Sequence, residues 1–246
     1  MKIQILSDLH LEFRGKYPTI STKADIIVVA GDLAASTPAT GTFWAWVRTK
    51  TDVPILYVLG NHEFYGHCWP DIIDNYRRVA EDHRITVLEN DTFIYNGIYF
   101  LGTTLWTDLD SGKCIPAAIN SMNDFYYIRK KKGKFQVQDW LNAHKQAVGW
   151  LEDELTKQKH STKVVITHHG PSFYLVSEMF KGDVLNGAFF AQLDNLILHA
   201  NPDLWLYGHS HCFCDKEIGS TRCIANPRGY PYEDTTGFKD PFLIEV

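Results

Sequence analysis

Side chains that commonly bind metal ions stand directly after five short apolar segments of this chain. The segments are residues 3–6, 26–30, 55–59, 164–166 and 204–207, and the motifs that follow them are Asp8-Leu9-His10, Gly31-Asp32, Gly60-Asn61-His62-Glu63, Thr167-His168-His169-Gly170 and Gly208-His209-Ser210-His211. Their oxygen and imidazole groups, without a thiolate, suit Mn, Fe, Zn or Co rather than Cu(I) or Ca²⁺. A single histidine of this kind is usually structural, but all five motifs together predict a metal site.

The number of these groups favours two metal ions over one. The five motifs offer more ligands than one tetrahedral zinc ion takes. A carboxylate such as that of Asp32 can bridge two ions that lie ~3.5–4 Å apart, which is the usual arrangement in two-metal hydrolases. Alternation along an extended segment would place His209 and His211 on one side. His62, directly after Asn61, is not expected to point the same way as its neighbour.

The elements that must position these groups are predicted to be strands of an α/β fold. The apolar runs 3–6, 26–30 and 55–59 are short and rich in β-branched residues, as buried parallel strands are. They alternate with helical patterns at residues 43–47 and 71–83, the second after Pro70, which predicts βαβ units. Open α/β sheets place their active sites beyond the carboxyl ends of the strands, so the motifs should meet at one edge.

The rest of the chain predicts further strands and helices. Asn96-Gly97 between residues 92–95 and 98–101 is typical of a hairpin with a type I′ turn. Residues 137–159 and 189–199 are predicted helices, residues 212–218 and 221–225 a second hairpin, and residues 242–246 a closing strand. The irregular stretch 103–134 contains Trp106, Phe125, Tyr126 and Tyr127. A small core cluster is favoured for these aromatics, and a cap that stacks on a substrate base is the alternative.

Composition restricts the class of protein. The chain has 246 residues, of which 45% are hydrophobic and 22% charged, which is enough for one large core and predicts a single domain over residues 1–246. A net charge of −5 argues against non-specific binding to nucleic acid. Neither a leader sequence nor a membrane span is visible, and the cysteine count is five, so we expect a cytoplasmic protein with reduced thiols. Cys212 and Cys214 are expected to pack on one face of a strand rather than to bind a soft metal.

The order of the motifs resembles that of the calcineurin-like metallophosphoesterase superfamily over residues 8–211. The resemblance implies a four-layer α/β/β/α sandwich with two mixed sheets and a dinuclear centre. It implies that one ion is held by Asp8, His10, Asp32 and His211, and the other by Asp32, Asn61, His168 and His209. His62 would then face the phosphate as a general acid or charge stabiliser, while His169 would stand behind the ligands or line the pocket.

Several branches of the superfamily fit the chain poorly. Leu33-Ala34-Ala35-Ser36 stands where the Ser/Thr protein phosphatases carry Asp-Arg-Gly, and His62 stands where the lipid A precursor pyrophosphatases carry arginine. The DNA-repair nucleases of the superfamily usually bring further domains, and we do not expect these in 246 residues. The small bacterial and phage phosphoesterases remain.

The sequence therefore predicts a dinuclear metal-dependent hydrolase of phosphoester bonds. The hypothesis for the reaction is attack on phosphorus by a hydroxide that the two ions generate from a bridging water. A phosphodiesterase acting on a small or nucleotide-like substrate is favoured, with a phosphomonoesterase as the alternative. A non-catalytic, metal-scaffolded binding module is disfavoured because such proteins usually lose ligands or the histidine of the Asn-His pair. The physiological substrate and the oligomeric state stay open.

Three further features admit two interpretations each. Arg228, in Asn226-Pro227-Arg228-Gly229-Tyr230, could bind a phosphate bidentately or belong to a structural turn. Glu63 could orient His62 or a neighbouring ligand, or simply begin a helix. The basic run Arg129-Lys130-Lys131-Lys132-Gly133-Lys134 could guide an anionic substrate, although a solvated loop is favoured.

Overall fold

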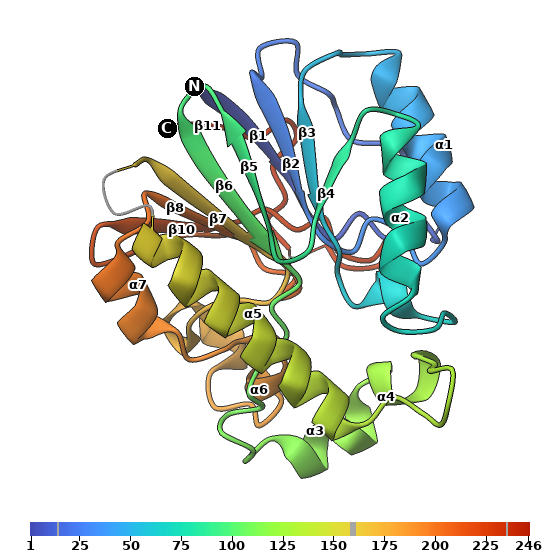
Figure 1. Ribbon diagram of the computed structural model, residues 1–246, viewed down its shortest axis with the longest axis vertical. Helices are drawn as coiled ribbons and strands as arrows, with labels where there is room; N and C mark the ends of the chain where they lie inside the picture. The colour runs from blue at the N-terminus through green and yellow to red at the C-terminus, as the bar shows by residue number, and fades with distance from the viewer. Residues whose placement is uncertain (14, 158–160, 235) are drawn as a thin grey trace.

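The first of two β-sheets has the strand order β11-β1-β2-β3-β4 (Figure 1). It is seen in a computed structural model that describes residues 1–13, 15–157, 161–234 and 236–246. The strands are β1 (Lys2–Leu6), β2 (Ile26–Ala30), β3 (Ile55–Val58), β4 (Thr86–Leu88) and β11 (Leu243–Glu245). Strands β1 to β4 run parallel, and β11 pairs antiparallel with β1, so the sheet is mixed.

The second sheet has the order β5-β6-β7-β8-β10-β9 and is also mixed. Its strands are β5 (Asp91–Tyr95), β6 (Ile98–Thr103), β7 (Lys163–Thr167), β8 (Leu204–Tyr207), β9 (Cys214–Ile218) and β10 (Thr221–Ala225). The four central strands are parallel, while β5 and β9 pair antiparallel at the two edges. Asn96 and Gly97 both have positive φ, 50° and 78°, which confirms the predicted type I′ hairpin between β5 and β6.

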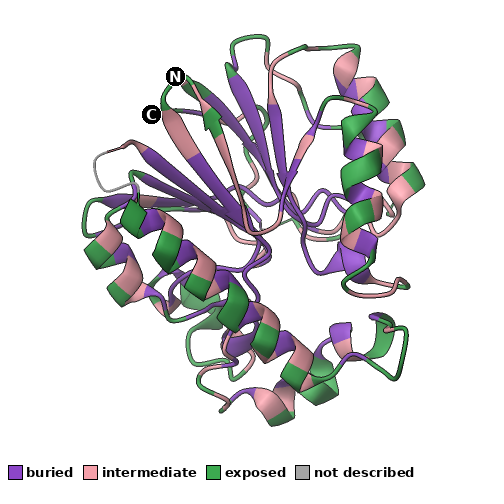
Figure 2. Cartoon of the chain, in the orientation of Figure 1, coloured by how far each residue is buried: buried purple, intermediate pink, exposed green. Residues whose placement is uncertain are grey.

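Three apolar layers hold the two sheets and the helices together. Between the sheets, buried side chains of the first, such as Ile5 and Val28, pack with those of the second, such as Phe100 and Ile166. Helices α1 (Thr37–Arg48) and α2 (Ile72–Glu81) cover the outer face of the first sheet, and α5 (Val137–Lys157) and α7 (Asp194–Ala200) that of the second (Figure 1). Figure 2 shows buried strands flanked by helices with one buried and one exposed side. The predicted four-layer α/β/β/α sandwich is confirmed.

The helices differ from the predicted ranges mainly at their ends. The side chain of Ser36 caps α1 by accepting a hydrogen bond from Ala39 N, so the helix begins well before residue 43. Helix α2 begins at Ile72, two residues after Pro70, and ends at Glu81. Helix α5 follows its prediction up to Lys157, and the last two residues of the predicted range, 158 and 159, lie outside the described residues.

The single helix predicted for residues 189–199 is wrong. The chain forms a short helix, α6 (Asn186–Phe189), and a separate helix, α7. Between them, Ala191 N donates to Gly170 O at 2.8 Å and Leu193 N to Pro171 O at 2.9 Å. These bonds to a distant segment replace the helical ones, so residues 190–193 are not helical despite a helical pattern of apolar residues.

The irregular stretch 103–134 contains two short helices, α3 (Ile115–Ser121) and α4 (Asp124–Tyr127). Trp106 is buried and Phe125 packs with it against the core that lies under α1 and α2. Tyr126 and Tyr127 are instead 66% and 54% exposed. The predicted core cluster is therefore right for two of the four aromatics.

Other short elements complete the chain. Three single turns of 3₁₀ helix are formed by His62–Phe64, Phe173–Leu175 and Glu178–Phe180. Strand β9 begins at Cys214, which is buried, whereas Cys212 precedes the strand and is partly exposed, so the two thiols do not share a strand face. Among the described residues, no helix combines the length and the apolar composition that crossing a membrane requires.

Candidate metal centre

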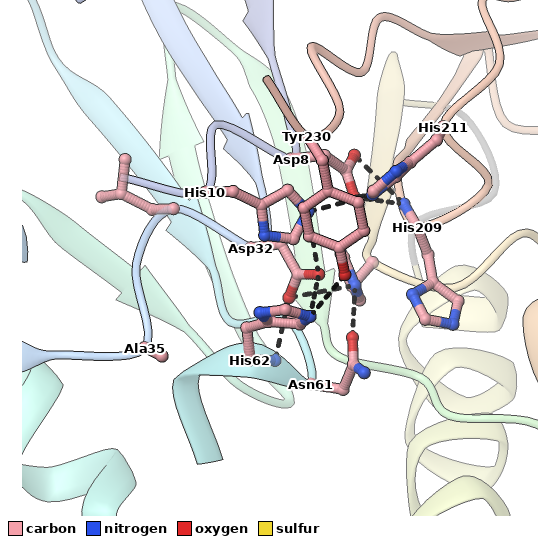
Figure 3. Close-up of polar contacts among 12 residues, drawn as sticks. Asp8, His10, Asp32, Ala35, Asn61, His62, His209, His211 and Tyr230 are labelled. Carbon is pink, nitrogen blue, oxygen red and sulfur yellow. Dashed lines mark hydrogen bonds and ion pairs between the residues drawn. The ribbon is translucent and has the colours of Figure 1, made fainter. Parts of the chain in front are cut away.

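The predicted ligands come together where the carboxyl ends of parallel strands from both sheets meet (Figure 3). In the first sheet, the loop after β1 carries Asp8 and His10, the loop after β2 carries Asp32, and the loop after β3 carries Asn61. In the second sheet, the loop after β7 carries His168, and the loop after β8 carries His209 and His211. Six of these seven side chains belong to buried residues, and His211 is partly buried. The two sheets pack face to face, so residues far apart in the chain become neighbours, such as His10 and His211, which are 201 positions apart.

One group consists of Asp8, His10, Asp32 and His211, whose ligand atoms all lie within 4.8 Å of one another. The Nε2 atoms of His10 and His211 are 2.9 Å apart. Nε2 of His211 lies 3.5 Å from Asp8 Oδ1, and Nε2 of His10 lies 3.8 Å from Asp32 Oδ2. Two carboxylates and two imidazoles thus face a common point.

A second group consists of Asp32, His168 and His209, again within 4.8 Å. Nε2 of His168 lies 3.4 Å from Asp32 Oδ1 and 3.1 Å from Asn61 Oδ1. Asp32 turns one carboxylate oxygen toward each group, which is the geometry that a bridging ligand requires.

Hydrogen bonds behind the first group determine which imidazole nitrogens are free. Nδ1 of His211 lies 2.7 Å from Glu233 Oε2, and Nδ1 of His10 lies 3.3 Å from Glu12 Oε1. A carboxylate accepts a hydrogen bond, so each Nδ1 carries the hydrogen and each Nε2 keeps its lone pair. The two Nε2 atoms thus face each other at 2.9 Å, where either a shared proton or a metal ion between them satisfies both lone pairs.

The second group shows the same feature. Nδ1 of His168 lies 2.9 Å from the carbonyl oxygen of Ala30, which leaves Nε2 free to face Asp32 and Asn61. Nε2 of His209 is buried and has no hydrogen-bond partner in the described part of the chain. A buried, unpartnered nitrogen is costly, and a metal ion would satisfy it. The residues of both groups therefore fit a metal with nitrogen and oxygen ligands.

The ionisable groups of the site strongly influence one another. Burial opposes the ionisation of Asp32, but the adjacent His168 and His62 hold the pKa of its carboxyl well below the usual value. For His211, burial is outweighed by Asp8 and Glu233, which raise the pKa of the imidazole to about 10. The carboxylates thus attract positive charge, as a cation site must.

The backbone of the site is strained at most of the ligands. Asp8, His10, Asp32, His209 and His211 have φ values of 52°, 42°, 51°, 65° and 47°, a region that residues other than glycine rarely adopt. Such conformations cost energy and persist where the surrounding structure requires them, often at functional sites. Here they turn the side chains that follow β1, β2 and β8 toward the common centre.

Two glycines of the motifs are required by the close approach of the loops. A Cβ atom at Gly60 would lie 2.5 Å from Asp32 N, and one at Gly208 would lie 2.6 Å from Asp8 Oδ2. Neither position has room for a side chain without displacing a ligand loop.

Glu63 is a buried carboxylate that holds the loop of the bridging aspartate. It accepts hydrogen bonds from Asp32 N, Leu33 N, Ala34 N, Gly60 N and Tyr57 Oη, at 2.6–3.2 Å. Of the two interpretations of Glu63, orientation of a neighbouring ligand agrees with these contacts, although the residue also lies in the 3₁₀ turn His62–Phe64.

His62 lies beside the two groups and faces a cavity. Its Nδ1 is 2.7 Å from Glu12 Oε1. Its Nε2 is 3.1 Å from the hydroxyl of Tyr230 (Figure 3). The Tyr230 ring also packs on the His10 ring, with centroids 4.4 Å apart. Atoms of His10, Glu12 and His62 form a further close group, in which the Glu12 carboxylate bridges the two imidazoles by hydrogen bonds.

Sequence reasoning missed three of these partners. Glu12 continues the alternation of Asp8 and His10 by one more step, so its spacing was a usable signal. Tyr230 and Glu233 lie in the loop after β10, where no local pattern marks them. Only the contacts with His62 and His211 reveal their role.

The other predicted site residues lie away from the cavity. Nδ1 of His169 is 3.1 Å from Thr104 O, and its ring packs behind His209, with centroids 4.4 Å apart. Arg228 donates a hydrogen bond to Lys16 O at 2.7 Å and does not line the cavity. This contact agrees with the structural turn rather than with phosphate binding.

The basic run is also outside the site. Lys130 and Lys131 form ion pairs with Asp139 and Asp71 at 2.6 and 2.7 Å, and no residue of 129–134 lines the cavity. These contacts agree with the favoured interpretation of a solvated loop.

The cavity has a volume of about 380 Å³, and its lining includes Asp32, Asn61, His62, His209 and His211. This volume lies within the range of small-molecule sites, ~300–1,000 Å³. Clustered metal-binding groups therefore open directly into a space that a small substrate could occupy.

Comparison with known proteins agrees with this geometry. The model of the family "Calcineurin-like phosphoesterase" matches residues 1–213. An uncharacterized protein, L509, of Acanthamoeba polyphaga mimivirus is 29% identical over 199 residues, which cover 73% of this chain and 69% of that protein.

Solved structures of low sequence identity share the fold. Phosphopantetheinyl hydrolase from Mycobacterium tuberculosis superposes with a TM-score of 0.74 at 15% identity, covering 94% of this chain and 90% of that one. A putative 5′-nucleotidase from Staphylococcus aureus gives a TM-score of 0.52 at 16% identity, covering 100% of this chain and 54% of that one. With the family match, the two mixed sheets and the clustered ligands, the chain belongs to the calcineurin-like phosphoesterase family and is a metal-dependent phosphoester hydrolase.

Proposed function

We propose that this chain is a phosphodiesterase that acts on a small or nucleotide-like substrate with two metal ions bound. The observation that carries the proposal is the bridging position of Asp32, whose two oxygens face separate ligand groups at the wall of one cavity. Asp8, His10, Asp32 and His211 would hold one ion, and Asp32, Asn61, His168 and His209 the other. When bound, Mn, Fe, Zn or Co ions would polarise the phosphoryl oxygens and make water a nucleophile at neutral pH.

The residues of the chain supply positioning and hydrogen bonds. Glu12 occupies Nδ1 of His62, so Nε2 is the atom that faces the cavity and the Tyr230 hydroxyl. From there His62 would donate a hydrogen bond to the phosphoryl group, or a proton to the leaving oxygen. Glu63 keeps the Asp32 loop in place, and Glu233 orients His211.

The charge of the cavity supports a diester as the substrate. Among the described residues that line the cavity there is no lysine or arginine. A phosphodiester carries one negative charge, whereas a monoester carries nearly two at neutral pH and gains more from additional cations. A phosphomonoesterase is the second candidate, because a structural neighbour is named a putative 5′-nucleotidase.

The proposal is tested by comparing bis(p-nitrophenyl) phosphate with p-nitrophenyl phosphate, using protein loaded in turn with Mn, Fe, Zn and Co. We expect a higher kcat/KM for the diester. A higher value for the monoester with every metal would favour the second candidate. If neither compound is hydrolysed with any metal, the result would instead support a non-catalytic, metal-scaffolded binding module.

The role of His62 is tested by the variant His62→Ala. We expect metal content like that of the wild type and a fall in kcat of about 100-fold or more, the usual contribution of a general acid. The matched control is His199→Ala, because His199 is an exposed histidine on α7 and should leave both quantities unchanged. Wild-type kcat in His62→Ala would contradict the assignment.

We also propose that residues 1–246 act as one catalytic domain in the cytoplasm. Ligands from residue 8 to residue 211 contribute to one centre, so any segment that contains the site spans at least residues 8–211. All five cysteines are free thiols, which suits a reducing compartment.

A further inference from the structure

One wall of the cavity beside the metal centre is apolar. The ring of Phe189 stacks on the imidazole of His209, with centroids 4.4 Å apart and an interplanar angle of 23°. Phe180, Leu185 and Met122 also line the cavity. The apolar wall, defined here by Met122, Phe180, Leu185 and Phe189, therefore contacts the second ligand group through Phe189.

The apolar wall is held in place before any substrate binds. Asn186 Nδ2 donates to Phe180 O at 2.7 Å, which ties the 3₁₀ turn Glu178–Phe180 to helix α6. Thr107 Oγ1 donates to Gly187 O at 2.7 Å, which ties α6 to the loop after β6. A preformed surface of this kind binds an apolar group at low entropic cost.

The cavity lining includes carboxylates as well as the histidines of the centre. Asp183 lines the cavity, is exposed, and accepts a hydrogen bond from Leu185 N at 2.8 Å. Glu233 also lines the cavity, beside His211. A substrate group on the apolar wall would thus have a carboxylate near it, and the described lining residues include no lysine or arginine to compensate.

We propose that the apolar wall binds an uncharged, largely apolar group esterified to the phosphate, and that Asp183 disfavours substrates that carry a second anionic group there. This inference rests on the proposed phosphodiesterase function. It predicts that an anionic second group, such as a further phosphate, lowers kcat/KM when it lies at the apolar wall near Asp183.

The experiment compares three p-nitrophenyl phosphodiesters whose second ester group is methyl, phenyl or 4-carboxyphenyl. The leaving group is the same, so differences in kcat/KM report on the second group. For the Mn-loaded wild type we expect the phenyl ester to exceed the methyl ester at least about tenfold, through contact with the apolar wall. We expect the 4-carboxyphenyl ester to fall about two- to fivefold below the phenyl ester, less so at high salt.

Two variants assign these differences to residues. Phe180→Ala should reduce the preference for the phenyl ester over the methyl ester, mainly by raising KM for the phenyl ester. Asp183→Asn should remove most of the discrimination against the 4-carboxyphenyl ester. Val184→Ala is the matched control, because Val184 is 61% exposed, lies between two lining residues and does not line the cavity itself. Equal rates for the methyl and phenyl esters, or ratios that neither variant changes, would overturn the inference.

A binding measurement separates this inference from the proposed function. Methyl-, phenyl- and 4-carboxyphenylphosphonate are titrated into the Mn-loaded protein by calorimetry, and we expect phenylphosphonate to bind most tightly. Hydrolysis of none of the three diesters would overturn the phosphodiesterase function, while the same order of phosphonate affinities would still support the apolar wall. Equal affinities for the three phosphonates would overturn the proposed role of the apolar wall in binding, even if the enzyme is active.

Discussion

Substitution of Glu63 by glutamine tests how the bridging aspartate is held. The carboxylate accepts four backbone N–H groups, of Asp32, Leu33, Ala34 and Gly60, and the hydroxyl of Tyr57. Oε1 takes those of Leu33, Ala34 and Tyr57, and Oε2 takes those of Asp32 and Gly60. A glutamine amide keeps one acceptor oxygen, so whichever way it is oriented at least two buried N–H groups lose their acceptor.

The expected loss of stability follows from that count. A buried donor without an acceptor costs about 1–3 kcal/mol, so two of them cost about 2–6 kcal/mol of the free energy of unfolding. For a chain of this size, each kcal/mol lowers Tm by roughly 2–4 °C, which gives a decrease of roughly 4–24 °C. The strained φ of Asp32, 51°, is then less well supported, so we also expect reduced metal content and reduced kcat.

The assay is thermal unfolding of the wild type and of Glu63→Gln with metal removed, followed by metal analysis and kinetics after loading with Mn. Glu152→Gln is the control, because Glu152 is exposed on α5 and its substitution should leave Tm within about 1 °C. A Tm for Glu63→Gln equal to that of the control, together with full metal content, would refute the reasoning.

Three further predictions concern the same centre and the core. Gly60→Ala should fold but lose metal and activity, because its Cβ would lie 2.5 Å from Asp32 N; Gly149→Ala on α5, where nothing lies within 4 Å of the added Cβ, should retain both. Chelation should lower Tm, and Mn at 100 times its dissociation constant should restore about 2.7 kcal/mol of stability; a Tm independent of metal would argue against a folded-state site. Leu56→Ala in the layer between the sheets should cost about 2–5 kcal/mol in denaturant titration, and a cost below 1 kcal/mol would contradict its complete burial.

The strand and motif pattern predicted most of the fold because its signals are local. Runs such as residues 26–30 are buried along their whole length, and Asn96-Gly97 forms the turn that its residue types favour. The helix predicted for residues 189–199 was wrong because bonds from Ala191 and Leu193 to residues 170 and 171 override the local preference. The stretch 103–134 gave no periodic signal, since its helices α3 and α4 are short.

The position of individual side chains in the site depended on contacts between distant segments. Arg228, a candidate for phosphate binding, instead bonds Lys16 O, 212 positions away in the chain. Tyr230, two residues later, reaches His62 across 168 positions. No pattern within the loop after β10 distinguishes these two residues, so sequence reasoning could not tell which of them faces the cavity.

The sequence by itself determined the ligand types and the edge of the fold at which they meet, because each motif directly follows an apolar strand and parallel strands end together. The tertiary structure decided how those ligands divide into two groups around Asp32, and which residues hold them. It placed Glu12, Glu63 and Glu233 behind the ligands, and the apolar wall beside them. The physical reason is that these contacts depend on where loops from both sheets pass one another, which the packing of the two sheets decides.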